Sequence, residues 1–300
     1  MSESPKAHRG TIFVEDAVVQ SVEAYSEQQY VLRLQSPRCA AQATAGSFVH
    51  LQCNEAIPMR RPLSIMRANA TEGWIEVLFK IVGEGLNALA DRQPGDLLSS
   101  LGPIGKGFTP HAERSHCVLI GGGVGIPPMV FLAETLKDRA QEHSALVLMG
   151  SEIPFPFTPV DSENDVAGVG DDTRAAMPLL ETWGIPSRLA SLSDFDGTHR
   201  GYVPDLARHH LSALSAAELA DTALYACGPT PMLAAVARLA ADFDLPCQVS
   251  LEEYMACAVG GCAGCTVRVE TDDGPAMKRV CVDGPVFEAS TVFPPPGQMR

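Results

Sequence analysis

Four cysteines near the C-terminus constrain this chain more than any other feature of its sequence. They are Cys257, Cys262, Cys265 and Cys281, separated by four, two and fifteen residues. The first three share a run of nine residues with three glycines. Thiolates that converge on one metal centre need a tightly wrapped loop that lends backbone N–H groups to the sulfurs, and glycine permits the positive-φ turns that this takes. We therefore expect a loop that holds metal through these four side chains.

The spacing of the cysteines distinguishes between kinds of metal site. A gap of four, a gap of two and a distant fourth cysteine is the plant-type pattern of a 2Fe–2S cluster. A structural zinc site usually has two close cysteine pairs that lie far apart in the sequence. Four unrelated buried cysteines are the remaining alternative. The pattern favours the cluster over zinc and over unrelated cysteines, and so indicates a chain that carries electrons.

The composition is that of a globular protein. The chain has 300 residues, 46% of them hydrophobic, which is enough for two or three domains. A net charge of −14 argues against a nucleic acid or an anionic membrane as partner. Residues 1–10 lack the apolar core of a signal peptide. The most apolar long window, 117–136, is broken by four glycines and two prolines. We expect a cytoplasmic protein whose thiols stay reduced.

Short strands dominate the first third of the chain. Each is a run of alternating or continuous apolar residues bounded by turn residues. Many short strands with Gly and Pro between them predict a sandwich or barrel, with one helical segment at 85–92. The predicted strands are 11–14, 30–34, 48–52, 63–67, 74–80 and 96–100.

One motif on this predicted barrel begins a strand with Arg61, Pro62, Leu63 and Ser64. An arginine there can pair with a pyrophosphate through two hydrogen bonds. A serine three positions later can hydrogen-bond a ring nitrogen of a heteroaromatic ligand, while Leu63 packs on that ring. The alternative is an ordinary solvated strand entry.

A second motif joins the strand residues Leu78, Phe79 and Lys80 to Gly83, Gly85 and Leu86. The strand leads to glycines at the start of a helix, where free N–H groups and the helix dipole favour a phosphate. A strand–helix turn that needs glycine only for its geometry is the competing interpretation.

From residue 116 the pattern changes to alternating strands and helices, which is typical of an α/β domain with a parallel sheet. A buried strand at 116–120 runs into Gly121, Gly122, Gly123 and Gly125, and a helix follows. Such a loop is where the pyrophosphate of a dinucleotide binds. The spacing differs from Gly-x-Gly-x-x-Gly, so the strand–loop–helix context carries the prediction.

Later strands of this domain supply three further expectations. Glu152, after a strand at 145–149, suits a ribose diol better than a 2′-phosphate and favours NADH, although it could be an ordinary surface carboxylate. Residues 151–175 form a long proline-rich, then acidic, segment to which we assign no role. A helix is predicted at 173–183, overlapping the end of this segment. A strand at 222–226 ends in Cys227, Gly228 and Pro229, where the thiol could face a nicotinamide or be a small buried hydrophobe.

These motifs occur in the order seen in the ferredoxin–NADP reductase superfamily. With the run Ser250–Cys257 and the terminal Cys281–Phe287, the chain closely resembles the electron-transfer subunits of two-subunit, NAD-linked bacterial dihydroorotate dehydrogenase. The resemblance covers roughly residues 10–290. Leu86 stands where that family commonly has threonine, and the 151–175 segment is not expected.

The resemblance implies three units: a Greek-key FAD-binding β-barrel (1–113), a parallel α/β NAD-binding domain (114–249) and a small 2Fe–2S module (250–300). It implies that Arg61 and Ser64 hold FAD, with 78–80 on the neighbouring strand and Gly85 and Leu86 at the phosphates. It also implies that the four cysteines ligate the cluster.

The implied reaction passes a hydride between NAD(H) and the flavin and single electrons onward through the cluster. The implied partner is an FMN-containing dihydroorotate dehydrogenase of pyrimidine biosynthesis, in a hetero-oligomer. No side chain need act as a catalytic acid or base. The alternatives are an NAD(P)H:ferredoxin-type or other acceptor oxidoreductase with the same cofactors, and a non-catalytic zinc-binding protein.

Overall fold

The structure is a computed structural model that describes residues 10–294. Residues 1–9 and 295–300 lie outside the described residues. They include most of the N-terminal stretch in which no signal peptide is expected, the start of the predicted FAD-binding unit and the end of the predicted 2Fe–2S module. Within 10–294, no helix has the length and apolar character needed to cross a membrane.

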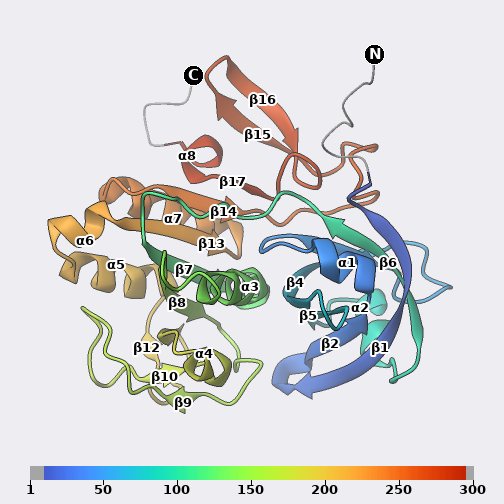
Figure 1. Cartoon of the computed structure of the whole chain (residues 1–300), viewed down its shortest axis with the longest axis horizontal. Helices are drawn as coiled ribbons and strands as arrows, with labels where there is room; N and C mark the ends of the chain where they lie inside the picture. Colours follow the sequence, from blue (N-terminus) through green and yellow to red (C-terminus); the bar gives the residue numbers. More distant parts are fainter. Residues whose placement is uncertain (1–9, 295–300) are drawn as a thin grey trace.

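The N-terminal part of the described chain is a closed antiparallel barrel (Figure 1). Its strand order, β1-β2-β5-β4-β3-β6, is a Greek key because β2 pairs with β5 and not with β3. The predicted barrel is confirmed. Its strands are β1 (Phe13–Tyr25), β2 (Gln29–Gln35), β3 (Phe48–Leu51), β4 (Arg61–Asn69), β5 (Trp74–Lys80) and β6 (Leu97–Ile104), with helices α1 (Pro37–Gln42) and α2 (Glu84–Ala90) in the connections.

Alternation along these strands fills the barrel. Leu32 and Leu34 of β2, Ile65 of β4 and Val77 of β5 are completely buried in one core. Successive side chains of a strand point to opposite faces, so residues two apart share the interior.

The second part is a seven-stranded sheet in the order β12-β11-β8-β7-β13-β14-β17. All neighbouring pairs are parallel except β14 and β17, which are antiparallel. The predicted parallel α/β domain is confirmed. The strands are β7 (His116–Gly122), β8 (Ser144–Gly150), β11 (Ser187–Ser191), β12 (His199–Arg200), β13 (Thr222–Cys227), β14 (Cys247–Ser250) and β17 (Val286–Glu288).

Helices cover both faces of this sheet, and the side chains of β7 show which helices lie on each face. Cys117 and Leu119 pack in the core that includes α3, whereas Val118 and Ile120 pack in the core that includes α5 and α7. Helix α3 lies between the sheet and barrel strand β4 (Figure 1), where Arg67 Nη2 is 2.7 Å from Glu134 Oε1. The helices are α3 (Ile126–Lys137), α4 (Pro178–Thr182), α5 (Val203–Ala213), α6 (Ala216–Ala220), α7 (Thr230–Asp242) and α8 (Ala289–Val292).

The C-terminal module is an excursion from the edge of this sheet. Residues 251–285 leave from β14, form the hairpin β15 (Thr266–Thr271) and β16 (Gly274–Arg279), and return as β17 beside β14. The Lys106 N–H, just after β6, donates to the Gly284 carbonyl at 2.6 Å. The boundaries 1–113, 114–249 and 250–300 stay a prediction, and a strand from beyond residue 250 completes the sheet.

The predicted helix at 173–183 is wrong over its first part. Ala175–Ala176 form β10, which pairs with β9 (Val160–Asp161), and α4 begins only at Pro178. Met177 precedes a proline, and proline pushes the residue before it towards extended backbone. Met177 is accordingly extended, with φ −79° and ψ 121°.

Candidate functional site

The hairpin β15–β16 brings two of the four cysteines together. Cys265 directly precedes β15, and Cys281 follows β16 by one residue. Thr266 pairs with Arg279, and the Val280 N–H donates to the Cys265 carbonyl at 2.9 Å. As a result the sulfurs of Cys265 and Cys281 lie 3.3 Å apart.

The other two cysteines meet in the loop before β15. The Cys262 N–H donates to the Cys257 sulfur at 3.4 Å, and the Gly264 N–H donates to the Cys262 sulfur at 3.4 Å. Burial raises the pKa of the Cys257 thiol, but backbone N–H groups, with that of Cys262 first and that of Val259 next, lower it to about 7. The loop therefore offers N–H donors to the sulfurs, as the sequence analysis expected.

The turns that aim these N–H groups are only partly glycine turns. The positive-φ residues of this loop are Ala258 (57°), Gly260 (80°) and Ala263 (55°). Left-handed backbone costs a residue with a Cβ about 1–2 kcal/mol. Successive N–H groups in such turns form a concave site for anions, and a thiolate is an anion.

The four cysteines fit a cluster with two irons. Among residues 10–294, no group of three or more His, Cys, Asp or Glu side chains is gathered around a single ion position. The Cys265 and Cys281 sulfurs lie together, and the Cys262 N–H contacts the Cys257 sulfur, so the cysteines form two close groups; a 2Fe–2S cluster takes four thiolates on two irons. Burial, with the neighbouring Cys265 thiol, raises the pKa of Cys281 to about 12. Metal binding there must displace protons.

On the barrel, the structure brings Arg61 and Gly85 into contact. Arg61 starts β4, and Gly85 lies in the first turn of α2. A Cβ on Gly85 would be 2.9 Å from Arg61 Nη2. The guanidinium donates to the Met59 carbonyl at 2.7 Å. The two barrel motifs predicted separately therefore share one half-buried place at the end of the barrel.

The side chains of the two barrel motifs divide into buried and accessible groups. Leu63, Leu78 and Phe79 belong to the barrel core, and Phe79 stacks on Tyr30 with ring centroids 5.4 Å apart. The expected packing of Leu63 on a flavin ring stays a prediction. Accessible members of the two motifs are Arg61, Pro62, Ser64, Lys80, Gly83 and Leu86.

The glycine loop, residues 121–125, lies against the turn at 227–229. Gly121 pairs with Cys227, because β7 and β13 are neighbours in the sheet. A Cβ on Gly125 would be 2.3 Å from the Cys227 carbonyl oxygen, and a Cβ on Gly122 would be 2.4 Å from the sulfur of Met232. These glycines permit the close approach of two loops at the carboxyl edge of the sheet, where open α/β sheets bind ligands.

Cys227 itself is 1% exposed, and burial raises its pKa well above the ordinary value. Its thiol is a small buried group in this structure. Gly228 is also buried, whereas Pro229 is exposed.

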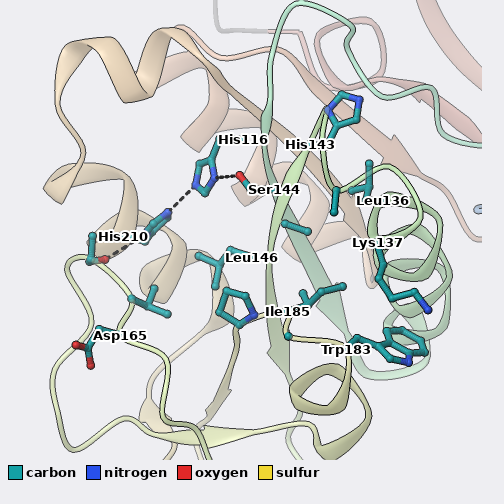
Figure 2. A pocket seen from close by; sticks show the side chains of 16 residues that line it. His116, Leu136, Lys137, His143, Ser144, Leu146, Asp165, Trp183, Ile185 and His210 are labelled. Carbon is teal, nitrogen blue, oxygen red and sulfur yellow. Dashed lines mark hydrogen bonds between the residues drawn. The ribbon is translucent and has the colours of Figure 1, made fainter.

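A cavity of about 350 Å³ lies at the opposite, amino-terminal edge of the sheet (Figure 2). His116 and Ser144, the first residues of β7 and β8, line it. His116 Nε2 is 3.2 Å from His210 Nε2, and His210 Nδ1 is 2.9 Å from the Ala167 carbonyl oxygen. These contacts join the 151–175 segment to α5 at the amino-terminal edge of the sheet, opposite the edge that carries the glycine loop.

A second cavity, of about 540 Å³, was missed by the sequence analysis. It lies beyond the carboxyl ends of β8 and β11, between the 151–175 segment and the loop at 194–196. The only sequence signal was the run of prolines and phenylalanines that begins the segment.

Solved structures of other proteins share the architecture of this chain. The chain aligns with an NADH-dependent reduced ferredoxin-NADP oxidoreductase at a TM-score of 0.74 and 22% identity, covering 93% of this chain and 90% of that one. A ferredoxin reductase of carbazole 1,9a-dioxygenase aligns at 0.59 and 22% identity, covering 78% and 67%. At these identities the likeness concerns the fold.

Curated relatives and a family model are more specific. The model described as the iron-sulfur cluster binding domain of dihydroorotate dehydrogenase B matches residues 252–293. The dihydroorotate dehydrogenase B (NAD(+)) electron transfer subunit of Desulforamulus reducens is 31% identical, covering 91% of this chain and 95% of that protein. The Bacillus caldolyticus subunit is 34% identical, covering 93% and 98%. The chain therefore belongs to the family of electron transfer subunits of NAD-linked dihydroorotate dehydrogenase B.

Proposed function

We propose that this chain passes electrons between NAD(H) and a catalytic dihydroorotate dehydrogenase subunit that contains FMN, in the cytoplasm. The observation that carries the proposal is the arrangement of the four cysteines, with the Cys265 and Cys281 sulfurs 3.3 Å apart and the Cys262 N–H on the Cys257 sulfur, in a module hydrogen-bonded to both the barrel and the sheet. Family membership supports the partner and the use of NAD.

Each predicted site has a proposed occupant. Bound FAD and a bound 2Fe–2S cluster would supply two-electron and one-electron chemistry, respectively. Arg61 and Ser64, with the ends of β5 and α2, would hold FAD. The glycine loop and the turn at 227–229 would hold the pyrophosphate and nicotinamide parts of NAD(H). The cluster ligands would be Cys257, Cys262, Cys265 and Cys281.

The protein's own groups have three tasks in this scheme. The Arg61 guanidinium offers charge-assisted hydrogen bonds to phosphate oxygens. Glycines at 121–125 let the backbone approach a dinucleotide closely. N–H groups around Cys257 and Cys262 stabilise negative charge on sulfur, and hydrogen bonds to the sulfurs are one way in which a protein sets a cluster's potential. None of these tasks requires a catalytic acid or base.

An anaerobic visible spectrum of the purified chain, before and after NADH, tests the proposal. Flavin bands and a broad iron–sulfur shoulder should both be present and both bleach. A colourless protein would contradict it. Stable copurification with an FMN protein would support the proposed partner, whereas a lone chain that reduces ferredoxin would favour the acceptor-oxidoreductase alternative.

Substitution of Arg61 tests the proposed flavin site. Arg61→Ala should weaken the binding of FAD by about 2–3 kcal/mol, which is the effect of removing a charged hydrogen-bond partner. Flavin content after desalting and titration of the apoprotein with FAD measure the change. The matched control is Arg38→Ala, an exposed arginine on α1. Equal FAD affinity in both variants would remove Arg61 from the site.

A further inference from the structure

Two histidines meet in the wall of the cavity at the amino-terminal edge of the sheet (Figure 2). His116 is the half-buried first residue of β7, and His210, on α5, is 4% exposed. Their Nε2 atoms lie 3.2 Å apart. Two imidazole nitrogens come this close either when one donates its proton to the lone pair of the other, or when both lone pairs bind the same metal ion.

The second nitrogen of each ring has a partner that limits how the ring is protonated. His210 Nδ1 is 2.9 Å from the Ala167 carbonyl oxygen, which only accepts, so the neutral ring carries its proton on Nδ1 and a lone pair on Nε2. His116 Nδ1 is 3.2 Å from Ser144 Oγ, and a hydroxyl both donates and accepts. Ser144 is therefore compatible with either tautomer of His116. When the His116 proton is on Nδ1, both Nε2 atoms present lone pairs to the same space.

The separation of the two Nε2 atoms matches two ligands of one ion. Zinc binds imidazole nitrogen at about 2.0–2.1 Å, so two such nitrogens at a tetrahedral angle are about 3.3 Å apart. Histidines that bind metal almost always donate their other ring N–H to a fixed acceptor, the position that Ala167 and Ser144 have here. In the part of the chain that the structure describes, no third His, Cys, Asp or Glu side chain joins the pair as a ligand. The cavity of about 350 Å³ has room for water in the remaining positions.

The charges around the pair favour a cation. Burial lowers the pKa of both His116 and His210, so both rings are neutral near pH 7 and keep a lone pair. The carboxylates of Asp221 and Glu218 oppose this shift of the pKa of His116, because they attract positive charge to the ring. Lys137 also lines the cavity, but it lies on the far side from the pair (Figure 2).

We propose that His116 and His210 together bind one divalent transition-metal ion, such as Zn²⁺ or Ni²⁺, through their Nε2 atoms. Imidazole suits these ions, whereas Mg²⁺ and Ca²⁺ prefer oxygen ligands. On binding, the His116 proton moves from Nε2 to Nδ1, and two metal–nitrogen bonds replace the hydrogen bond between the rings. The ion joins β7 to α5. Because Ala167 belongs to the 151–175 segment, that segment gains an anchor whose strength depends on metal.

Calorimetric titration of the chain, loaded with FAD and the cluster, with Zn²⁺ tests the site. His116→Gln and His210→Gln should each weaken the binding of one ion at least about a hundredfold, and Ser144→Ala, which removes the partner of one ring, about tenfold. Mg²⁺ should not compete. The iron–sulfur absorbance should stay constant during the titration, which keeps the four cysteines out of the measured event. The same absorbance shows whether each variant is folded and loaded.

NMR of the histidine ring nitrogens in the wild type is a test that needs no variant. Zn²⁺ should shift the Nε2 signals of two rings together and saturate at one ion. The unfolding temperature should rise with the concentration of Zn²⁺, because the ion binds the folded chain. Signals that stay in place in the presence of Zn²⁺ would overturn the proposal.

His209→Gln is the matched control for the two cavity variants. It changes an exposed histidine one residue from His210 that does not line the cavity and whose ring meets His199, with centroids 5.2 Å apart. This variant should keep the ion that His116→Gln and His210→Gln lose. Equal binding by the wild type and both cavity variants, or loss of the ion in His209→Gln alone, would identify an adventitious surface ion and overturn the proposal.

Discussion

His50 is a buried histidine where the barrel meets the segment that leads to Cys257. It is 1% exposed on β3, between Val49 and Leu51, whose side chains fill the barrel. Strand alternation therefore places the His50 ring on the outside of the barrel. The backbone of Met255, two residues before Cys257, lies near the ring, although neither ring nitrogen has a well-formed hydrogen bond.

Protonation of His50 should weaken the fold. Burial, and then the charge of Arg60, lowers the pKa of His50 from 6.5 to about 4. The unfolded chain, with its higher pKa, binds the proton first as the pH falls. The contribution to the free energy of unfolding is therefore complete above about pH 6.5 and is lost between about pH 6.5 and 4.

Denaturant unfolding of the wild type and His50→Leu across this pH range measures the effect. The wild type should lose up to about 1.4 kcal/mol per pH unit more than the variant. Identical slopes for the wild type and His50→Leu would show that His50 does not titrate in this way.

At the residue scale, the sequence identified the four cysteines but not the backbone of the loop that carries three of them. Four cysteines at those spacings are informative because few metal sites share them. Ala258 and Ala263 could not be predicted as left-handed residues, because local preference at both positions disfavours that backbone. The hydrogen bonds that the loop makes with the sulfurs outweigh the preference.

At the scale of elements, alternation predicted all six barrel strands but not their lengths. β1 was expected at 11–14 and extends over Phe13–Tyr25, of which only Ala17 and Val19 are buried. Its backbone pairing with β2 and β6 continues where the apolar pattern stops. The pairing of β17 with β14 also could not be predicted, because it joins segments that are far apart in the sequence.

The contact between the glycine loop and the turn at 227–229 can be broken with one methyl group. Gly125→Ala would place a Cβ 2.3 Å from the Cys227 carbonyl oxygen, and the two loops would have to separate. We expect a loss of about 2–3 kcal/mol in stability, together with at least a tenfold slower reduction of the flavin by NADH. Thermal unfolding and stopped-flow absorbance measure these two effects.

Gly123→Ala is the matched control within the same loop. Its Cβ would have no neighbour within 4 Å, and only its φ of 55° is unfavourable. The expected cost is about 1 kcal/mol. If Gly125→Ala were no less stable than Gly123→Ala, close packing of the two loops would not be required.

At the scale of the whole molecule, Cys265 and Cys281 lie outside the hydrophobic cluster that contains most of the barrel core. That cluster includes α3 and one face of the sheet, whereas the two cysteines belong to the other cluster, which takes only Phe48 and Ile104 from the barrel strands among its fully buried members. Loss of metal from the module should therefore leave the barrel folded.

Cys265→Ser tests this separation. We expect loss of the iron–sulfur absorbance and of bound iron, with FAD and its reduction by NADH retained. Cys53→Ser, a change at a buried barrel cysteine, should keep the iron. Iron analysis and flavin spectra of the two variants give the answer. Loss of flavin from Cys265→Ser would mean that the barrel depends on the module.

The module is attached to the sheet at both of its ends and is also hydrogen-bonded to the segment that follows barrel strand β6. It leaves from β14, returns as β17 beside the same strand, and receives the hydrogen bond from Lys106 next to the barrel. Its position is thus set by backbone hydrogen bonds and not by a flexible tether. An electron that crosses between barrel and module then covers a constant distance, and its rate should not depend on solvent viscosity, as it would for a carrier that swings between two docking positions.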